Sequence, residues 1–169
     1  SCIVLGALLA NASSIIGAAT HITMHAFGKI TLFFCAGAIL LAAGKTKVSE
    51  MDGLGRQMPL TMGAFLVASI SIVGLPPFGG FWGKWYLALG SLDGNYAVFV
   101  GVLMLSTLLN IAYLLPIPIR AFFAGDRGAV VIGEAPVACL IAMAVTTTMC
   151  LLLFFYPAPI LQLARLLVP

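Results

Sequence analysis

Four long stretches of this sequence are apolar and almost free of charged side chains, which restricts the chain to a membrane fold. They cover residues 14–43, 60–92, 96–124 and 137–156. A helix that spans a bilayer needs about 20 mainly apolar residues. Of the 169 residues, 62% are hydrophobic and 8% are charged, whereas a soluble domain carries roughly a quarter charged residues. The sequence therefore predicts an all-α, polytopic bundle of transmembrane helices in a lipid bilayer.

The two ends of the chain are shorter apolar segments. Residues 1–10 are about half as long as a span, and no initiator Met precedes them. Residues 157–169 are mostly apolar and include Arg165, which is typical of a segment that lies along the membrane interface. We expect residues 1–169 to form a single transmembrane domain, a fragment from which an N-terminal part is missing.

Most charged side chains lie in two polar segments, residues 44–59 and 125–136. We interpret Glu50 and Asp52 in the first segment as solvated charges. We likewise interpret the charged side chains of the second segment as loop charges: Asp126, Arg127 and Glu134.

The basic side chains also predict an orientation. If the spans alternate in direction, Arg165 lies on one side of the membrane. Five basic residues lie on the other: Lys45, Lys47, Arg56, Arg120 and Arg127. The positive-inside rule then makes residues 44–59 and 125–136 cytoplasmic. The basic residues are scattered rather than clustered, so nucleic acid is excluded as a partner.

The stretch over residues 60–92 is too long for one straight span. Its 33 residues would form a helix of roughly 50 Å, well over the ~30 Å hydrocarbon core. Its middle contains Pro76 and Pro77, and a proline in a helix clashes with the carbonyl four residues back, here those of Ile72 and Val73. We expect one discontinuous helix, whose freed carbonyls meet neighbouring protein or water. The residues assigned to this break are Gly74, Pro76, Pro77, Gly79 and Gly80.

Three ionisable side chains lie on one face of the first long span. His21, His25 and Lys29 are four residues apart and therefore share one side of a helix. An ionisable group inside a membrane span is costly and is a functional candidate by default. Histidine exchanges protons near neutral pH, and lysine, unlike arginine, can release its proton. This histidine–lysine row predicts a proton pathway; alternatively, the histidines only hydrogen-bond between helices.

Lys84 is the fourth ionisable side chain within a predicted span. It follows the break by about one helical turn, beside Gly80 and Gly83, which leave room for water or for a closely packed backbone. A buried charge beside a broken helix is typical of ion sites in transporters. The alternative is that Lys84 pairs with an acidic residue on a helix outside this sequence.

No motif for a cofactor or a metal is present. His21 and His25 have the spacing of a zinc protease, but the Glu that should follow the first histidine is replaced by Ile22. Lys84 follows a glycine as in a phosphate-binding loop, but Trp85 replaces the required Ser or Thr. The four cysteines stand singly in apolar runs, without metal spacing or a disulfide framework. We expect no cofactor and no metal.

Five short motifs follow one another in a specific order. They are HITMHAFGKITLFFCAG (21–37), DGLG (52–55), MP (58–59), GLPP (74–77) and GFWGK (80–84). Together they resemble the antiporter-like subunit family, which comprises the proton-translocating subunits of respiratory complex I and subunits of Mrp-type sodium/proton antiporters. The resemblance covers about the first 125 residues, and residues from 128 onward are generic.

The resemblance implies that this chain holds most of the second of two inverted five-helix repeats. It also implies that His21, His25, Lys29 and Lys84 form the proton pathway, within a complex of several subunits in the bacterial inner membrane. Residues 25–37 and 45–59 are most similar to the D-type subunit of Mrp-type antiporters, which implies exchange of protons for sodium or another monovalent cation.

Two alternatives to an antiporter subunit remain. The first is a proton-translocating membrane-arm subunit of an NADH:quinone oxidoreductase or a related membrane hydrogenase, in which other chains carry the redox chemistry. The second is a scaffold that transports nothing, although the cost of burying Lys29 and Lys84 argues against it.

Overall fold

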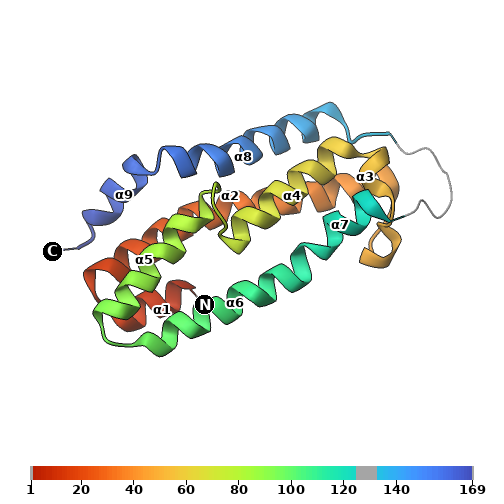
Figure 1. Ribbon diagram of the computed structural model, residues 1–169. Helices are drawn as coiled ribbons and strands as arrows, with labels where there is room; N and C mark the ends of the chain where they lie inside the picture. Colours follow the sequence, from red (N-terminus) through yellow and green to blue (C-terminus); the bar gives the residue numbers. More distant parts are fainter. Residues whose placement is uncertain (1, 125–132, 169) are drawn as a thin grey trace.

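The computed structural model describes residues 2–124 and 133–168, and they form an elongated bundle of helices (Figure 1). Among these residues, three helical segments are long and apolar enough to cross a membrane: 12–43, 97–123 and 137–155. The predicted all-α transmembrane bundle with one broken helix is confirmed. The helices are α1 (Cys2–Leu9), α2 (Ala12–Ala43), α3 (Leu54–Gln57), α4 (Pro59–Val73), α5 (Gly80–Asp93), α6 (Ala97–Leu114), α7 (Pro116–Phe123), α8 (Val137–Phe155) and α9 (Ala158–Arg165), with a 3₁₀ turn at Val48–Glu50.

Helix α2 is the central helix of the bundle and packs against α1, α4, α5, α8 and α9. A capping box fixes its start, because the Asn11 side chain accepts from the Ser14 backbone amide and the Ser14 hydroxyl accepts from the Asn11 backbone amide. It ends at Gly44, whose φ of 62° is the left-handed conformation typical of a helix stop. Helices α6 and α8 lie along opposite sides of the bundle (Figure 1).

The start of α2 is bonded to the end of α5. The side-chain amide of Asn11 donates to the Gly90 carbonyl at 2.6 Å, and the Ser13 hydroxyl donates to the Asp93 carboxylate at 2.8 Å. Both acceptors lie in the last turn of α5, where the Gly90 carbonyl also accepts from the Gly94 backbone amide. The two side-chain bonds therefore set the register in which α5 lies against α2.

The broken helix consists of α4 and α5. Helix α4 ends at Val73, and Gly74 follows with a φ of 83° while its amide donates back to Ile70 and Ser71. Helix α5 begins at Gly80, so the interruption covers residues 74–79. A helix ends at this point because the next residues include Pro76 and Pro77, which cannot continue it.

Asp52 is not a solvated charge as predicted. Its side chain is only 5% exposed and accepts two hydrogen bonds from Arg120 on α7, one from Nε and one from Nη2, each at 3.0 Å. Leu54 and Met58 beside it are buried in the core. The segment 44–59 is therefore partly folded onto α7, because a bidentate ion pair compensates the burial of the carboxylate.

Glu134 is likewise more than a loop charge. Its carboxylate accepts from the Leu60 amide at 2.6 Å and from the Thr61 hydroxyl at 2.9 Å. Both groups lie in the first turn of α4, where amides have no partner within the helix and the helix dipole favours an anion. Glu134 therefore caps α4 from the other polar segment. Asp126 and Arg127 lie outside the described residues.

We expect Asp52→Asn to destabilise the protein by about 1–2 kcal/mol, because it leaves Arg120 without its ionic partner. The loss is limited because the Arg120 side chain is 48% exposed and can be hydrated. The measurement is the thermal unfolding midpoint of the purified protein. The control is Glu50→Gln, an exposed carboxylate in the same segment. Equal midpoints for the two variants would contradict the structural role of the ion pair.

Candidate functional site

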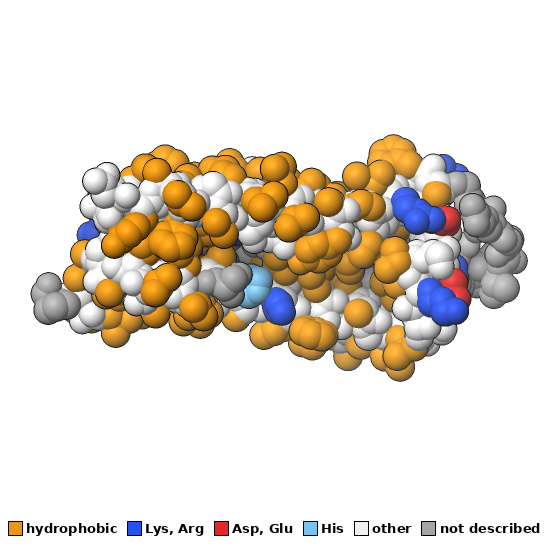
Figure 2. Space-filling model, turned by 90° about the horizontal axis from the view of Figure 1, so that it is seen from below, with side chains coloured by type: hydrophobic (Ala, Val, Ile, Leu, Met, Phe, Trp, Pro, Cys, Tyr) orange, Lys and Arg blue, Asp and Glu red, His pale blue; other side chains and the backbone are white. Residues whose placement is uncertain are grey.

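A cavity of about 540 Å³ lies between α2 and α6 and is open to the surface. Figure 2 shows a histidine and a basic side chain at a hollow in the middle of a largely hydrophobic face, away from the charges that gather at one end of the bundle. The lining residues are Cys2, Ile3, His21, His25, Lys29, Leu32, Phe33, Ala36, Phe65, Ile72, Lys84, Ser106, Asn110, Tyr113 and Leu114. All four ionisable residues predicted from the sequence therefore reach one cavity.

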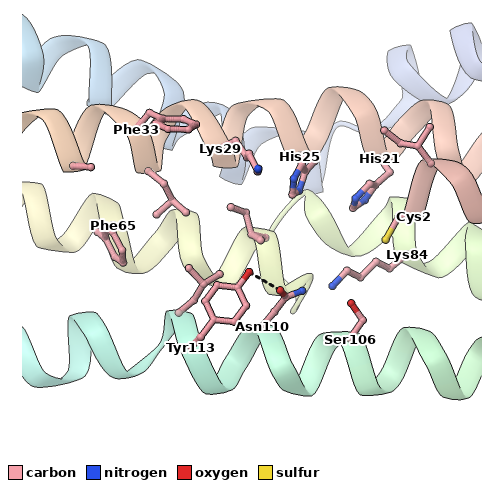
Figure 3. Close-up of a pocket in the computed structure, with 15 residues that line it drawn as sticks. Cys2, His21, His25, Lys29, Phe33, Phe65, Lys84, Ser106, Asn110 and Tyr113 are labelled. Atoms are coloured by element: carbon pink, nitrogen blue, oxygen red, sulfur yellow. Dashed lines mark hydrogen bonds between the residues drawn. The ribbon is translucent and has the colours of Figure 1, made fainter. Parts of the chain in front are cut away.

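The histidine–lysine row lies along one face of α2, as Figure 3 shows. The rings of His21 and His25 are stacked, with centroids 5.0 Å apart. His21 is buried, His25 is half-buried and Lys29 is exposed. The Nδ1 atoms of both histidines are buried and have no hydrogen-bond partner among the described residues. Buried polar atoms normally have partners, so these nitrogens favour a cavity that admits water.

Lys84 extends from α5 to the end of the other half of the broken helix. Its ammonium donates to the Val73 carbonyl at 2.6 Å and to the Thr107 hydroxyl on α6 at 3.2 Å. Val73 is the last residue of α4 and its carbonyl is one of the two that the prolines were predicted to free. The cavity lining named above contains no carboxylate. Within the described part of the chain, Lys84 therefore contacts backbone and hydroxyl dipoles.

Two glycines bring backbones together around Lys84. A Cβ at Gly80 would collide with the Ser71 carbonyl of α4, and one at Gly83 would lie 2.8 Å from the Cα and Cβ of His21. At Gly80 and Gly83 the missing side chain therefore allows backbones to pack closely, and it does not leave space for water. Gly83 thus allows α5, which bears Lys84, to pack closely against His21 of α2.

Helix α8 holds the start of α5 in place. The Gly79 amide donates to the Cys150 carbonyl at 2.9 Å, and the Trp82 indole donates to the Phe154 carbonyl at 3.0 Å. Phe154 is in the last turn of α8, where carbonyls lack partners within the helix. Residues from 128 onward look generic in the sequence, yet Cys150 and Phe154 among them position the turn that leads to Lys84.

Sequence reasoning also missed the polar face of α6. Ser106, Asn110 and Tyr113 line the cavity, and Thr107 contacts Lys84. The Tyr113 hydroxyl donates to the Asn110 side chain at 2.8 Å, which Figure 3 marks with a dashed line. The sequence signal that could have revealed this face is the spacing of its neutral polar residues, which recur every three or four positions in an otherwise apolar helix.

The described residues contain no cluster of three or more His, Cys, Asp or Glu side chains that could bind a metal ion.

A family profile and individual relatives place this chain in the same protein family. A sequence profile described as "NADH:quinone oxidoreductase/Mrp antiporter, TM" matches residues 2–110. NADH-quinone oxidoreductase subunit N of Desulforudis audaxviator is 44% identical over 123 residues, which are 73% of this chain and 25% of that protein. The D-type subunit of the Na(+)/H(+) antiporter of Bacillus subtilis is 30% identical over 126 residues, which are 74% of this chain and 25% of that protein.

The fold also matches that of one chain in a solved membrane complex. The structure of the Mrp complex from Dietzia sp. DQ12-45-1b contains a chain that matches 96% of this one with a TM-score of 0.86 and 19% sequence identity. The match covers 39% of that chain. This chain therefore spans about a quarter of the length of the two curated relatives and 39% of the length of the matched chain.

Removing the Trp82 indole N–H should loosen the start of α5. We expect Trp82→Phe to cost about 1 kcal/mol, because the Phe154 carbonyl loses its donor while an aromatic ring is kept. The thermal unfolding midpoint of the protein should therefore fall. Trp85→Phe is the matched control, since Trp85 lies three residues further along α5 and is 48% exposed. If both variants behave alike, the bond to α8 does not position the helix.

Proposed function

Because this chain belongs to the NADH:quinone oxidoreductase/Mrp antiporter transmembrane family, we propose that it is a membrane subunit that translocates protons through the cavity between α2 and α6. One observation carries the proposal: His21, His25, Lys29 and Lys84 all line a single cavity between helices. Ionisable groups at such depth are costly to keep, and a proton pathway gives each of them a purpose.

The arrangement supports passage of a proton along the cavity. Lys84 interacts electrostatically with both His21 and His25, and Lys29 interacts in the same way with His25. A change of charge at one group therefore alters the cost of a charge at the next. His21, His25 and Lys29 follow one another along α2, and Lys84 reaches the same cavity from α5, so a proton that enters at one lysine can be relayed by imidazole and water to the other.

The proposed assembly is a multisubunit antiporter that exchanges protons for Na+ or another monovalent cation. The relative from Bacillus subtilis, a subunit of a Na(+)/H(+) antiporter, supports this assignment. A second candidate is a membrane-arm subunit of an NADH:quinone oxidoreductase, and the 44% identity to a subunit N favours it. Both assemblies would use the same proton pathway.

Other membrane subunits, or another part of the same subunit, are proposed to cover the open side of the cavity. Lys29 lies near the middle of α2 and is exposed. A lysine at that depth cannot remain against hydrocarbon without a polar neighbour. The proposed location is the inner membrane of a bacterial cell.

Lys84 is the first residue to test. We expect Lys84→Ala to lower proton flux by at least about tenfold, because a group that holds the proton in transit is lost. Lys84→Arg should fail as well, since a guanidinium keeps its proton. Flux is measured with a pH-sensitive dye in membrane vesicles that carry the assembled complex, and Lys47→Ala, an exposed lysine in the polar segment, is the control. Normal flux in the Arg variant would reduce Lys84 to a fixed positive charge.

The driving force distinguishes the two assemblies. Proton flux that depends on a sodium gradient and not on NADH would support the antiporter. Flux that requires NADH and quinone would support the oxidoreductase. Both results leave the proton pathway itself intact.

The orientation gives a separate prediction. We expect residues 44–59 and 125–136 to face the cytoplasm, because Lys45, Lys47 and Arg56 lie at that end of the bundle. In a background without the four native cysteines, Ser49→Cys and Tyr96→Cys should be labelled by an impermeant maleimide from opposite sides. Both positions are exposed and lie at opposite ends of the broken helix. Labelling of both from one side would overturn the orientation.

A further inference from the structure

The Thr107 hydroxyl is oriented by its own helix. It donates its single hydrogen to the Leu103 carbonyl, one turn earlier in α6, at 2.9 Å. A hydroxyl has one hydrogen and two lone pairs, so the oxygen that faces Lys84 can only accept. Thr107 is therefore fixed as an acceptor for the Lys84 ammonium, which lies 3.2 Å away.

The second partner of Lys84 is also an acceptor. The Val73 carbonyl lies at the C-terminal end of α4, where unpaired carbonyls carry the negative end of the helix dipole. Both contacts are stronger for a charged donor than for a neutral amine. The cavity lining formed by the described residues offers Lys84 no carboxylate, so these two dipoles are the groups shown to stabilise its charge.

From this geometry we infer that Thr107 is a positioning residue of the proposed proton pathway, which holds the Lys84 ammonium against the end of α4 and thereby sets the pH range in which Lys84 passes its proton on. The inference rests on the proposed function, since it assigns Thr107 a part in the same pathway. It concerns a residue of α6 that carries no ionisable group.

Other titratable groups face Lys84 and must be considered in any pH dependence. Helix α1 contributes Cys2, and α2 contributes His21 and His25, with Lys29 further along the cavity. Helix α6 contributes Tyr113, whereas the lining residues from α4, Phe65 and Ile72, do not titrate. None of these groups bonds to Thr107 in the structure, so a change at Thr107 acts on the pH profile through Lys84.

The test is proton flux against pH for Thr107→Val in vesicles that carry the assembled complex. Valine has the shape of threonine but accepts no hydrogen bond. Without this acceptor the charged form of Lys84 is less stabilised, and Lys84 releases its proton at lower pH. The profile should therefore move to lower pH by about one unit, the size expected for one hydrogen bond to a charged group.

Matched variants separate this role from packing. Thr107→Ser keeps the hydroxyl and should restore the wild-type profile, and Thr107→Ala should repeat the shift if the valine variant fails to assemble. Thr146→Val on α8 removes a hydroxyl that bonds its own helix in the same way, to the carbonyls of Ala142 and Met143, and should leave the profile unchanged.

The outcomes distinguish the inference from the proposed function. A lower maximal flux in Thr107→Val without displacement of the profile, or an unchanged profile in both the Val and Ala variants, overturns the positioning role while the pathway stands. Full flux in Lys84→Ala overturns the proposed function itself. A profile that is displaced in Thr107→Val and unchanged in Thr107→Ser supports both the positioning role and the proposed function.

Discussion

The bond between the Lys84 ammonium and the Val73 carbonyl is the contact on which the site depends. In hydrocarbon, a carbonyl freed by a helix break has no bulk water to accept from, and a lysine has none to donate to. Burying either group alone costs free energy, and the hydrogen bond between them offsets much of the cost for both. The break and the lysine therefore form one feature, in which the interruption of the backbone creates the acceptor that the charged side chain requires.

This contact survives because the surrounding helices leave little freedom to the two half-helices. Gly83 permits the close approach of α5 to His21 on the central helix α2, and Asn11 fixes the far end of α5. On the other side, α8 holds Gly79 and Trp82 through its own carbonyls. Lys84 is thus positioned by contacts on both faces of α5, and a precise placement of this kind is what the proposed relay of protons requires.

The elements that could be predicted from the sequence are those that depend on local pattern. Hydropathy indicated the long helices, Pro76 and Pro77 indicated the break, and spacing placed His21 and His25 on one face. What could not be predicted depends on partners distant in the chain: Asp52 meets Arg120 68 residues later, and Thr61 meets Glu134 73 residues later. A charge in a polar segment looks solvated until the fold shows what lies beside it.

If the proposed function holds, the basic groups that line the cavity limit which ions can pass through it. Its described lining has two lysines and two histidines and no carboxylate, so it opposes the entry of a sodium ion, whereas a proton can be carried by the basic groups themselves. If the complete complex is an antiporter, this cavity suits the proton half of the exchange. Sodium would then need a separate route lined by oxygen ligands, the kind that hard cations prefer, in a part of the complex beyond the residues described here.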